Sequence, residues 1–548
     1  MLLIECKDVK KYFGDRILLD IENLKVYAAD RIGIVGVNGA GKTTLMHILT
    51  KRLRPDEGWV KGYERHAYIS QLEKPERESL DREMASKFGI SDSWQERMSG
   101  GEKTRFKLAA AFSENMDLIF ADEPTSNLDM EGIELLERML EEYKGALILI
   151  SHDRSFLDKL CTQIWEIENG KVKVYKGNYS DYCILKSEER TRKAFEYEAY
   201  VKEKKRLEEA IGQTKEKAKG IKKAPKRMGN SEARLHKMGD QKSKANLDRA
   251  VKRMASRIVH LEVKEKPIKQ EGIKLDMEDI HKLHSKIIIE GEHIHKAFGE
   301  KLLFKNGAFS IYNGAKVGLI GPNGCGKSTL IKMIINQDPS IKLSKGAKIG
   351  YFSQDMNILK ENLTILENVL EDSAYPQSFA RTLLARLLIK GEDVHKKIHL
   401  LSGGERVKVS FAKILLQDIH LLILDEPTNY MDVNALEVIE DALKDYDRTL
   451  LFVSHDRKFV RALADHIMTI ENHDIKMFKG SYAAYIESRN KIVERGKKEI
   501  EKEILILQNR LSEVLGKLSI PAKKDDPVAL DKEYHEILGR LNRLKSSL

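Results

Sequence analysis

Hydrophobic residues form short uninterrupted runs in some parts of the chain and recur every three or four positions in others. Two of the short runs, residues 32–35 and 317–320, each lead into a glycine-rich loop and then into a helical pattern. A short apolar run followed by glycine is typical of a buried strand, and the order strand, loop, helix is typical of α/β structure. The pattern therefore predicts α/β domains in two separate parts of the chain.

These two parts are copies of one unit, because further segments recur in the same order. RIGIVGVNGAGKTTL at 31–45 returns as KVGLIGPNGCGKSTL at 316–330, and ADEPTSNLD at 121–129 returns as LDEPTNYMD at 424–432. A glutamine and a following SGGE segment stand 28 residues apart in the first copy (71 to 99) and 48 apart in the second (354 to 402). We expect the first domain to span residues 1–183 and the second, with the larger insert, residues 286–486.

Residues 184–285, between the copies, have a helical pattern with one interruption. No glycine or proline occurs from position 178 to 211. After glycines and a proline at 220, 225, 229 and 239, a heptad stripe follows, formed by Leu247, Val251, Met254, Ile258 and Leu261. We predict an antiparallel helical hairpin that breaks at those four positions, with its tip near residues 212–245. About 30 helical residues would make an arm of roughly 45 Å.

The C-terminal residues 487–548 repeat this pattern on a smaller scale. Two heptad stripes lie on either side of the prolines at 521 and 527. The first consists of Ile500, Ile504, Leu507, Leu511, Val514 and Leu518, and the second of Leu530, Tyr534, Ile537, Leu541 and Leu544. We predict a C-terminal helical hairpin in which the stripes serve packing.

Positive charge is concentrated in the middle segment. Residues 186–266 contain 25 lysines and arginines and 13 aspartates and glutamates, a net charge of +12, whereas the whole chain carries +10. A basic segment favours a polyanionic partner, and the nine basic and two acidic residues between 215 and 237 favour nucleic acid. A solvated pair of charged helices is the alternative interpretation.

Other bulk properties exclude some classes of protein. No stretch approaches the roughly 18 uninterrupted apolar residues of a membrane span. Charge at Glu5 comes too early for a signal peptide. The four cysteines, at positions 6, 161, 183 and 325, lack metal-ligand spacing. These features predict a cytoplasmic protein with reduced thiols and no membrane association.

Two glycine-rich loops provide the first chemical signature. GVNGAGKT at 36–43 and GPNGCGKS at 321–328 both fit G-x-x-x-x-G-K-[ST]. Glycine lets backbone amides curl around phosphates, and the N-terminus of the following helix favours an anion. The loops predict two ATP sites. The expected nucleotide-binding residues are Gly36, Asn38, Gly39, Gly41, Lys42, Thr43, Thr44, Gly321, Asn323, Gly324, Gly326, Lys327, Ser328 and Thr329.

An Asp–Glu pair ends an apolar run in each copy. Buried carboxylates at the end of a strand destabilise a protein unless they serve a metal or act as a base. We therefore expect Asp122 and Asp425 to hold Mg²⁺ through water. Glu123 and Glu426, one position further, are the expected groups that orient or deprotonate the attacking water.

Four further polar residues are candidates because of their order around these motifs. Gln71 and Gln354 are placed to sense the metal and the γ-phosphate, and His152 and His455 to contact the γ-phosphate. Each of them alone would more often be a structural polar residue. The full set of expected metal ligands is Thr43, Gln71, Asp122, Ser328, Gln354 and Asp425.

Phosphate loop, glutamine, SGGE, DEPT and SHD follow one another in this order in both copies, and the set resembles the ATP-binding cassette ATPases. The resemblance implies two cassettes that close head to tail within one chain, each ATP lying between one phosphate loop and the opposite signature. By this resemblance, the nucleotide held by Lys42 is covered by Ser402, Gly403 and Gly404. The nucleotide held by Lys327 is covered by Ser99, Gly100 and Gly101.

Some positions are ambiguous or depart from the family pattern. Phe13 and Phe298, at matching repeat positions, are candidates for stacking on adenine, and ordinary core aromatics are an equal alternative. Met98 replaces the leucine of the signature, a conservative change. Residues 126–129 and 429–432 both lack the histidine that is common in relatives, which puts the geometry of coupling between the cassettes in question, but not hydrolysis.

Tandem cassettes joined by a long basic helical linker resemble the ABC-F group. This resemblance implies a protein that binds the ribosomal E site beside P-site tRNA, with its linker directed toward 23S rRNA at the peptidyl-transferase centre. The 28 residues between Gln71 and Ser99 leave no room for the arm of housekeeping members. The chain thus most resembles the antibiotic-resistance members of the Vga type. That resemblance implies protection against lincosamides, streptogramin A compounds and pleuromutilins, with ATP hydrolysis releasing the protein.

Three other functions remain open. A housekeeping ABC-F translation factor would share the ATPase and the ribosome but would not change drug susceptibility. The ATPase subunit of a transporter would need separate membrane subunits and has no use for a linker of charge +12. A DNA-repair ATPase would bind duplex DNA, although the sequence has no zinc module or recognisable DNA-reading motif.

Overall fold

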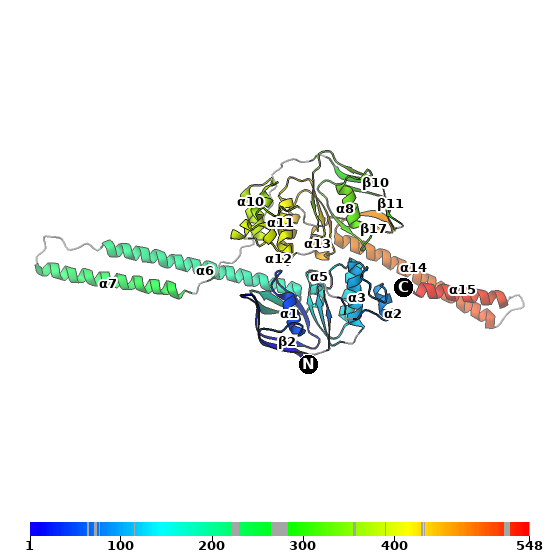
Figure 1. Ribbon diagram of the computed structural model, residues 1–548, viewed down its shortest axis with the longest axis horizontal. Helices are drawn as coiled ribbons and strands as arrows, with labels where there is room; N and C mark the ends of the chain where they lie inside the picture. The colour runs from blue at the N-terminus through cyan, green and yellow to red at the C-terminus, as the bar shows by residue number, and fades with distance from the viewer. Residues whose placement is uncertain are drawn as a thin grey trace.

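The computed structural model shows two α/β cassettes lying against each other, with two helical extensions that project in opposite directions (Figure 1). It describes residues 1–62, 65–70, 74–75, 77–113, 116–220, 230–261, 264, 283, 285–299, 301–353, 358–389, 391–428, 431, 433–519 and 527–546. For residues 220, 230–243, 434, 492–499, 519, 527–529 and 545–546 it describes the backbone alone. The predicted fold class, two tandem cassettes with helical hairpins, is confirmed.

Each cassette is built on a six-stranded sheet with the phosphate-loop strand inside it. In the first cassette the sheet order is β5 (His66–Ile69), β6 (Leu118–Asp122), β7 (Ala146–Ile150), β3 (Arg31–Val35), β8 (Gln163–Glu168), β9 (Lys171–Lys176). In the second it is β14 (Ile349–Phe352), β15 (Leu421–Asp425), β16 (Thr449–Val453), β12 (Lys316–Ile320), β17 (His466–Glu471), β18 (Asp474–Lys479). Only the last strand of each order runs antiparallel to its neighbour.

A three-stranded antiparallel sheet completes each cassette. Its strands are β1 (Leu2–Phe13), β2 (Arg16–Tyr27) and β4 (Glu57–Gly62) in the first, and β10 (Ile287–Phe298), β11 (Lys301–Tyr312) and β13 (Ile341–Leu343) in the second. Both faces of the parallel sheet are covered, so β6 and β7 are buried at every position. Alternate residues of one strand therefore belong to different hydrophobic cores. Phe120 packs in the core between the parallel and antiparallel sheets, and Ile119 packs in the core between the parallel sheet and the helices.

The helices of the two cassettes differ mainly in the insert before the signature. The first cassette has α1 (Lys42–Leu49), α2 (Arg82–Phe88), α3 (Gly100–Phe112), α4 (Met130–Glu142) and α5 (Arg154–Leu160). The second has α8 (Lys327–Ile335), α9 (Ile365–Leu370), α10 (Gln377–Arg386), α11 (Gly403–Leu415), α12 (Val433–Lys444) and α13 (Arg457–Leu463), with short 3₁₀ turns at Gly391–His395 and Ile398–Leu400. The larger insert expected in the second copy thus folds as α9, α10 and the two turns.

The middle segment forms the predicted antiparallel hairpin of α6 (Tyr179–Gly220) and α7 (Asn230–His260). One expectation was wrong: α7 continues through Gly239, where we expected a break. A single helical glycine destabilises a helix by only about 1 kcal/mol, which the surrounding helix formers offset. The 42 residues of α6 span about 63 Å, longer than the expected arm. The heptad stripe of α7 is half-buried between exposed neighbours, as expected for its packing face.

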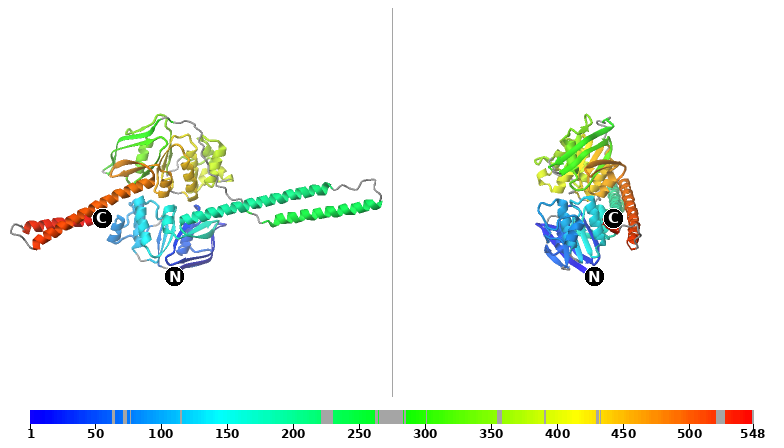
Figure 2. Two further views of the ribbon diagram at one scale, coloured as in Figure 1. Left: turned by 180° about the vertical axis from the view of Figure 1, so that it is seen from behind. Right: turned by 90° about the vertical axis from the view of Figure 1, so that its right-hand side faces the viewer.

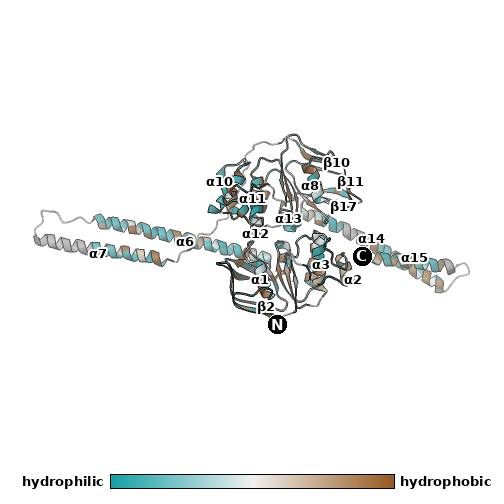
Figure 3. Cartoon of the chain, viewed as in Figure 1, coloured by the Kyte–Doolittle hydropathy of each residue, from teal (hydrophilic) through white to brown (hydrophobic). Residues whose placement is uncertain are grey.

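Ion pairs fix the register of the hairpin. Arg257 of α7 lies 3.5 Å from Glu203 of α6, and Lys264 lies 3.6 Å from Glu196. In both pairs the two residue numbers add to 460. The same sum therefore identifies the residues of α6 and α7 that lie opposite each other. Figure 3 shows that polar residues cover most of α6 and of the coloured part of α7, with isolated apolar positions between them.

The C-terminal hairpin consists of α14 (Tyr482–Ser519) and α15 (Pro527–Ser546). Both predicted stripes are confirmed as its packing faces, because their residues form one hydrophobic cluster centred on Ile504, Val514, Ile537 and Leu541. The views in Figure 2 show this hairpin and the α6–α7 hairpin leaving the cassettes on opposite sides. Across the described part of the chain, no helix is long and apolar enough to span a bilayer.

Candidate ATP sites between the cassettes

The sheet order brings the separate sequence motifs of each copy together. Strands β6, β7 and β3 are parallel neighbours, so their carboxyl ends lie at one edge of the sheet. That edge carries the 36–43 loop after β3, Asp122 and Glu123 at the end of β6, and His152 just after β7. A ligand site at the carboxyl ends of parallel strands is the usual arrangement in open α/β sheets. The second cassette repeats it with β15, β16 and β12.

The glycines of the phosphate loops stand where other residues do not fit. Gly41 and Gly326, which precede α1 and α8, have φ angles of 98° and 112°, in the region that favours glycine. A Cβ on Gly326 would also lie 2.7 Å from the ring of Phe304. The Nζ of Lys42 donates to the carbonyl of Gly36 at 2.9 Å, so the ammonium group lies over its own loop. Lys327 makes the equivalent bond, and it is largely buried.

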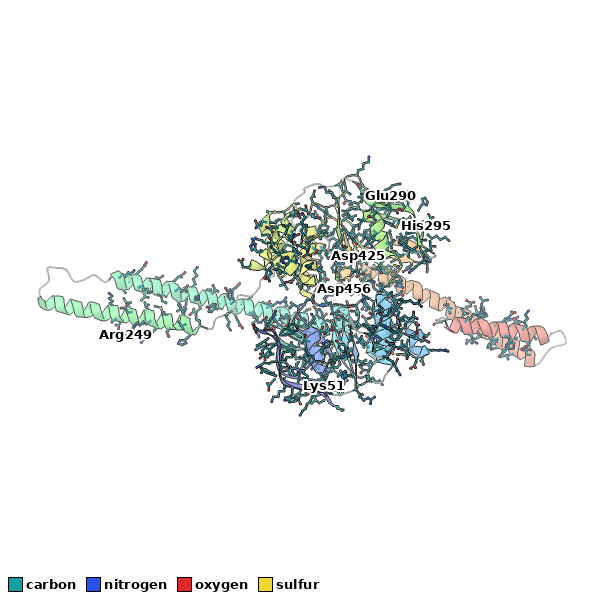
Figure 4. The ribbon with its side chains drawn as sticks, viewed as in Figure 1. Lys51, Arg249, Glu290, His295, Asp425 and Asp456 are labelled. Carbon is teal, nitrogen blue, oxygen red and sulfur yellow. The ribbon has the colours of Figure 1, made fainter. Side chains whose placement is uncertain are left out.

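An aspartate and a hydroxyl group lie side by side in each site. The side chain of Thr43 hydrogen-bonds to Asp122, and that of Ser328 to Asp425. Burial raises the pKa of both carboxyl groups above its usual value, and the hydroxyl donors partly oppose that rise. Oδ1 of Asp425 is buried and has no hydrogen-bond partner among the described residues. Figure 4 places Asp425 on the side of the second cassette that faces the first.

Each predicted base is in contact with the histidine of its own cassette. His152 Nε2 lies 3.3 Å from Oε1 of Glu123, and its backbone N–H donates to Oε2 at 3.3 Å. His455 Nε2 lies 3.1 Å from Oε1 of Glu426. Both glutamates have positive φ angles, 51° and 53°, which are uncommon for residues other than glycine and occur often at functional sites. Burial and the neighbouring Asp122 charge raise the pKa of Glu123 to about 8.

The signature serines begin helices. Ser99 caps α3 by accepting a hydrogen bond from the N–H of Glu102 at 3.3 Å, and Oε2 of Glu102 accepts the N–H of Ser99 at 2.8 Å. Ser402 and Glu405 form the same reciprocal pair at the start of α11. These capping boxes fix the helix N-termini, whose free amide groups favour a negatively charged ligand.

Each phosphate loop faces the signature of the opposite cassette. A cavity of about 640 Å³ is lined by Asn38 and Gly39 on one side and by Ser402 and Gly404 on the other. At the other site the contact is direct, because a Cβ on Gly101 would lie 3.1 Å from Nδ2 of Asn323. The cassettes are therefore arranged head to tail, as the resemblance implied.

The two candidate adenine-stacking residues are not core aromatics. Phe13 is 76% exposed and Phe298 is 58% exposed, so the core interpretation is wrong for both. Phe13 also lines a cavity of about 780 Å³ together with Lys42, Thr43 and Glu123. Their role in stacking stays a prediction. Gln71 and Gln354 lie outside the described residues.

A contact near Asn127 was missed by the sequence reasoning. Nδ2 of Asn323 donates to the carbonyl of Asn127 at 2.7 Å, and its backbone N–H donates to Oδ2 of Asp129 at 3.0 Å. Asp129 also caps α4 by accepting the N–H of Gly132 at 2.9 Å. The segment 126–129 therefore joins the first cassette to the phosphate loop of the second, although it lacks the family's usual histidine.

A charged cluster between α5 and α13 was also missed. Arg154 of the first cassette binds Glu440 of the second, and Arg457 of the second binds Glu137 of the first. The signal was present in the repeat, since the same arginine follows SHD at 151–153 and at 454–456. The two glutamates could not be identified from a sequence pattern, because each pairs with an arginine of the other cassette.

Asp153 lies in this cluster, and its charge is unfavourable there. Burial and the charge of Asp456 raise its pKa to about 6. A carboxyl group whose pKa is raised by folding destabilises the folded protein above that pKa, and this penalty disappears as pH falls toward the unfolded value. Asp153 also caps α5 by accepting the N–H of Ser155 and Phe156, a role that asparagine can fill.

We therefore expect Asp153→Asn to raise the unfolding temperature at pH 8 and to have a smaller effect near pH 4.5. A pKa change of about two units corresponds to at most about 3 kcal/mol. Thermal unfolding of both proteins at the two pH values measures the effect. A loss of stability at pH 8, or an equal gain at both values, would contradict the prediction.

Comparison with known proteins agrees with this geometry. A family model described as ABC transporter matches residues 19–88 and 304–429, and a second with the same description matches residues 165–253. The chain is similar to the ribosome protection protein VmlR of Bacillus subtilis, with 32% identity over 99% of this chain and 98% of that protein. It is also 32% identical to the erythromycin resistance ATP-binding protein MsrA of Staphylococcus epidermidis, over 82% of this chain and 93% of that protein.

More distant similarities extend the comparison. The energy-dependent translational throttle protein EttA of Mycobacterium tuberculosis is 28% identical over 88% of this chain and 95% of that protein. The solved structure of an RNase-L inhibitor has a TM-score of 0.56 and 21% identity over 87% of this chain and 91% of that chain, a likeness of fold. With matching cassette models, paired ATP sites and a relative of 32% identity along its whole length, the chain belongs to the ABC-F family of ATP-binding cassette ATPases.

Proposed function

We propose that this ATPase binds the E site of cytoplasmic ribosomes and protects the peptidyl-transferase centre against antibiotics. The observation that carries the proposal is the α6–α7 hairpin, a long projection with the chain's excess of positive charge. The relatives of the chain include a ribosome protection protein and an erythromycin resistance protein. The proposed drug classes are lincosamides, streptogramin A compounds and pleuromutilins.

The hairpin has the chemistry expected of an RNA-binding arm. Arg192, Lys205 and Arg206 are solvent-exposed, and each forms a surface ion pair with a glutamate of α6. Exposed pairs of this kind are weak, so phosphate groups can replace the glutamates. Contacts to phosphates position a protein on RNA without reading its sequence. A helix of about 63 Å is long enough to carry the end of the hairpin from the cassettes deep into a large RNA particle, close to 23S rRNA and P-site tRNA.

The root of the hairpin is fixed firmly to the first cassette. Lys186 is 8% exposed, and its Nζ donates to Glu166 at 2.7 Å and to Glu168 at 2.9 Å. The hydroxyl group of Tyr182 also donates to Glu166, at 2.8 Å. These glutamates belong to β8, the neighbour of the phosphate-loop strand β3. The arm is thus attached directly to the sheet that supports ATP binding.

The second cassette also contacts this root. Nζ of Lys458 lies 5.5 Å from the ring centre of Tyr179, the buried first residue of α6. A movement of the second cassette relative to the first would therefore reach the base of the arm. This contact supports the proposal that the ATP state of the cassettes controls the arm.

The residues of both sites fit ATP with Mg²⁺. Within the described residues no group of three His, Cys, Asp or Glu side chains could hold a metal alone. Mg²⁺ commonly takes one or two protein oxygens together with phosphates and water. Thr43 with Asp122, and Ser328 with Asp425, provide such oxygens, and the unpartnered Oδ1 of Asp425 suits a cation. When bound, the ion would neutralise phosphate charge; Gln71 and Gln354 are proposed as further ligands.

The chain's own groups would then activate water. Glu123 and Glu426 are the proposed bases, and their contacts with His152 and His455 hold the carboxylates in place. The amide groups at the starts of α3 and α11 would stabilise negative charge on the phosphates of the opposite site. Hydrolysis removes the link that the γ-phosphate makes between the cassettes, so the cassettes open and the protein leaves the ribosome.

A second candidate function is that of a translation factor without a role in resistance. The similarity to the energy-dependent translational throttle protein EttA favours it. The short segment between Gln71 and Ser99 favours protection instead, because it leaves no room for the arm of housekeeping members. Both functions need the ribosome and ATP, so only drug rescue separates them.

The proposal is tested in a purified translation system that contains no membrane. A lincosamide or a pleuromutilin is added to inhibit reporter synthesis, and the protein is then added with ATP. We expect synthesis to recover, because protection acts on the ribosome and not on drug transport. A drug that binds the small-subunit decoding centre provides the control, and its inhibition should not be relieved. If no peptidyl-transferase drug is relieved while ATPase activity is present, the translation-factor function is the better one.

A further inference from the structure

Two reciprocal Arg–Glu pairs join the cassettes; three of the four side chains are buried, and Arg457 is 17% exposed. Arg457, the first residue of α13, binds Glu137 of α4 through both terminal nitrogens, one of them at 3.3 Å from Oε2. Arg154, the first residue of α5, binds Glu440 of α12 in the same way. Glu137 is 2% exposed and Arg154 is 1% exposed. Such forked pairs fix the orientation of both side chains as well as neutralising their charges.

Each arginine of these pairs stands two residues after a histidine that contacts a proposed base, His152 or His455. In the second cassette, His455 contacts Glu426, Asp456 caps α13 through the N–H groups of Lys458 and Phe459, and Arg457 reaches Glu137. The short segment 455–457 is therefore anchored at one end by the base and at the other by the opposite cassette.

Helix α4 connects this anchor to the phosphate loop of the same site. Its cap, Asp129, accepts the backbone N–H of Asn323, and Glu137 lies eight residues further along the helix. Eight residues of α-helix span about 12 Å. One rigid helix of the first cassette thus touches both the phosphate loop and the histidine segment of the second cassette.

We propose that Glu137 and Arg457 are positioning residues of the ATPase, and that α4 acts as a spacer that sets His455 and Glu426 relative to the phosphate loop. The reaction at the second site is then competent only when the first cassette is docked. By the repeat, Glu440 and Arg154 serve the first site through α12. None of the four side chains lines the cavities beside the phosphate loops, so the effect on turnover is indirect.

The test uses the full chain with Glu123→Gln, so that only the second site turns over ATP, and adds the substitution Glu137→Gln. It keeps the size of the side chain but removes the charge that holds the arginine fork. Displacement of catalytic groups by about 1 Å lowers rates about 100-fold, so we expect kcat to fall by about 10-fold to 100-fold. KM should change less than threefold, because no phosphate-loop residue is altered. Cassette closure on ATP, followed by energy transfer between dyes on the two cassettes, should persist.

Two further variants separate positioning from simple adhesion. Asp441→Asn on α12 removes an exposed carboxylate that pairs with Lys444 at 3.2 Å, and its kcat should stay within twofold of the unmodified chain. The double variant Glu137→Leu with Arg457→Met replaces the buried pair by apolar groups, which commonly preserves stability. It should fold and close on ATP but keep the low kcat.

The proposal is overturned if Glu137→Gln leaves kcat unchanged, or if its loss of kcat is matched by loss of closure. Recovery of kcat in the apolar double variant would also overturn it, because adhesion alone would then be sufficient. If Glu137→Gln does not fold, the double variant decides the question by the same measurements.

Discussion

Glu123→Gln combined with Glu426→Gln should lower ATP turnover by roughly 10²–10⁴-fold, the usual loss when a general base is removed. The two glutamates are the acidic groups that contact His152 and His455 at the edge of the parallel sheets. Glutamine keeps their shape but cannot accept a proton from water. Binding of ATP should persist, because the phosphate loops and the Asp–hydroxyl pairs are unchanged. Phosphate release measures turnover, and equilibrium dialysis measures binding.

The matched control is Glu142→Gln, an exposed glutamate at the end of α4. Its turnover should match that of the unmodified chain. The double variant should also stay closed on ATP and remain bound to ribosomes in a sucrose gradient. Turnover close to the unmodified rate would exclude both glutamates from the mechanism, whether or not the variant stays bound to ribosomes.

Shortening the α6–α7 hairpin should abolish drug protection and spare ATP hydrolysis. The register of the two helices places residue 212 opposite residue 248, so removal of residues 213–247 and closure with a short turn keeps the remaining helices paired. The nucleotide sites lie in the cassettes and the buried root at Lys186 is retained, so turnover should stay within about twofold. Reporter synthesis with drug present should not recover, because the shortened arm cannot reach the peptidyl-transferase centre.

A second variant separates length from charge. Lys215, Lys217 and Lys219 changed to glutamine keep the length of α6 but remove positive charge near its end. We expect this variant to bind ribosomes more weakly than the unmodified chain. Its affinity should also fall less steeply as salt is added, because it makes fewer phosphate contacts. Full protection by the shortened protein would show that the hairpin is only a solvated connection between cassettes.

Local patterns predicted much of this structure. The run at 32–35 became the buried strand β3, and the stripes of the C-terminal segment became the contact faces of α14 and α15. Both depend on spacing within one segment, which sequence records directly. The phosphate loops and the Asp–Glu pairs were also recognisable, because their chemistry needs fixed residue types at fixed spacing.

Contacts between segments far apart in the chain were beyond such reasoning. Glu137 appears in the sequence as one more charged residue of an amphipathic helix, yet it is almost fully buried against Arg457. Its partner is decided by how two folded cassettes dock, and one sequence contains no record of that. The predicted helix break at Gly239 was wrong for another reason. The low helix propensity of glycine is a weak preference, and the flanking residues keep the helix continuous.

The buried attachment of α6 gives the molecule the mechanics of a lever. Lys186, with its two glutamate partners on β8, makes the helix turn as one body with the first cassette. A rotation of that body by about 10° would displace the far end of a helix about 63 Å long by roughly 11 Å. This is about the height of three stacked bases, at 3.4 Å each along a strand. A rotation of about 10° between the cassettes is thereby enlarged into a stroke on the scale of nucleotides.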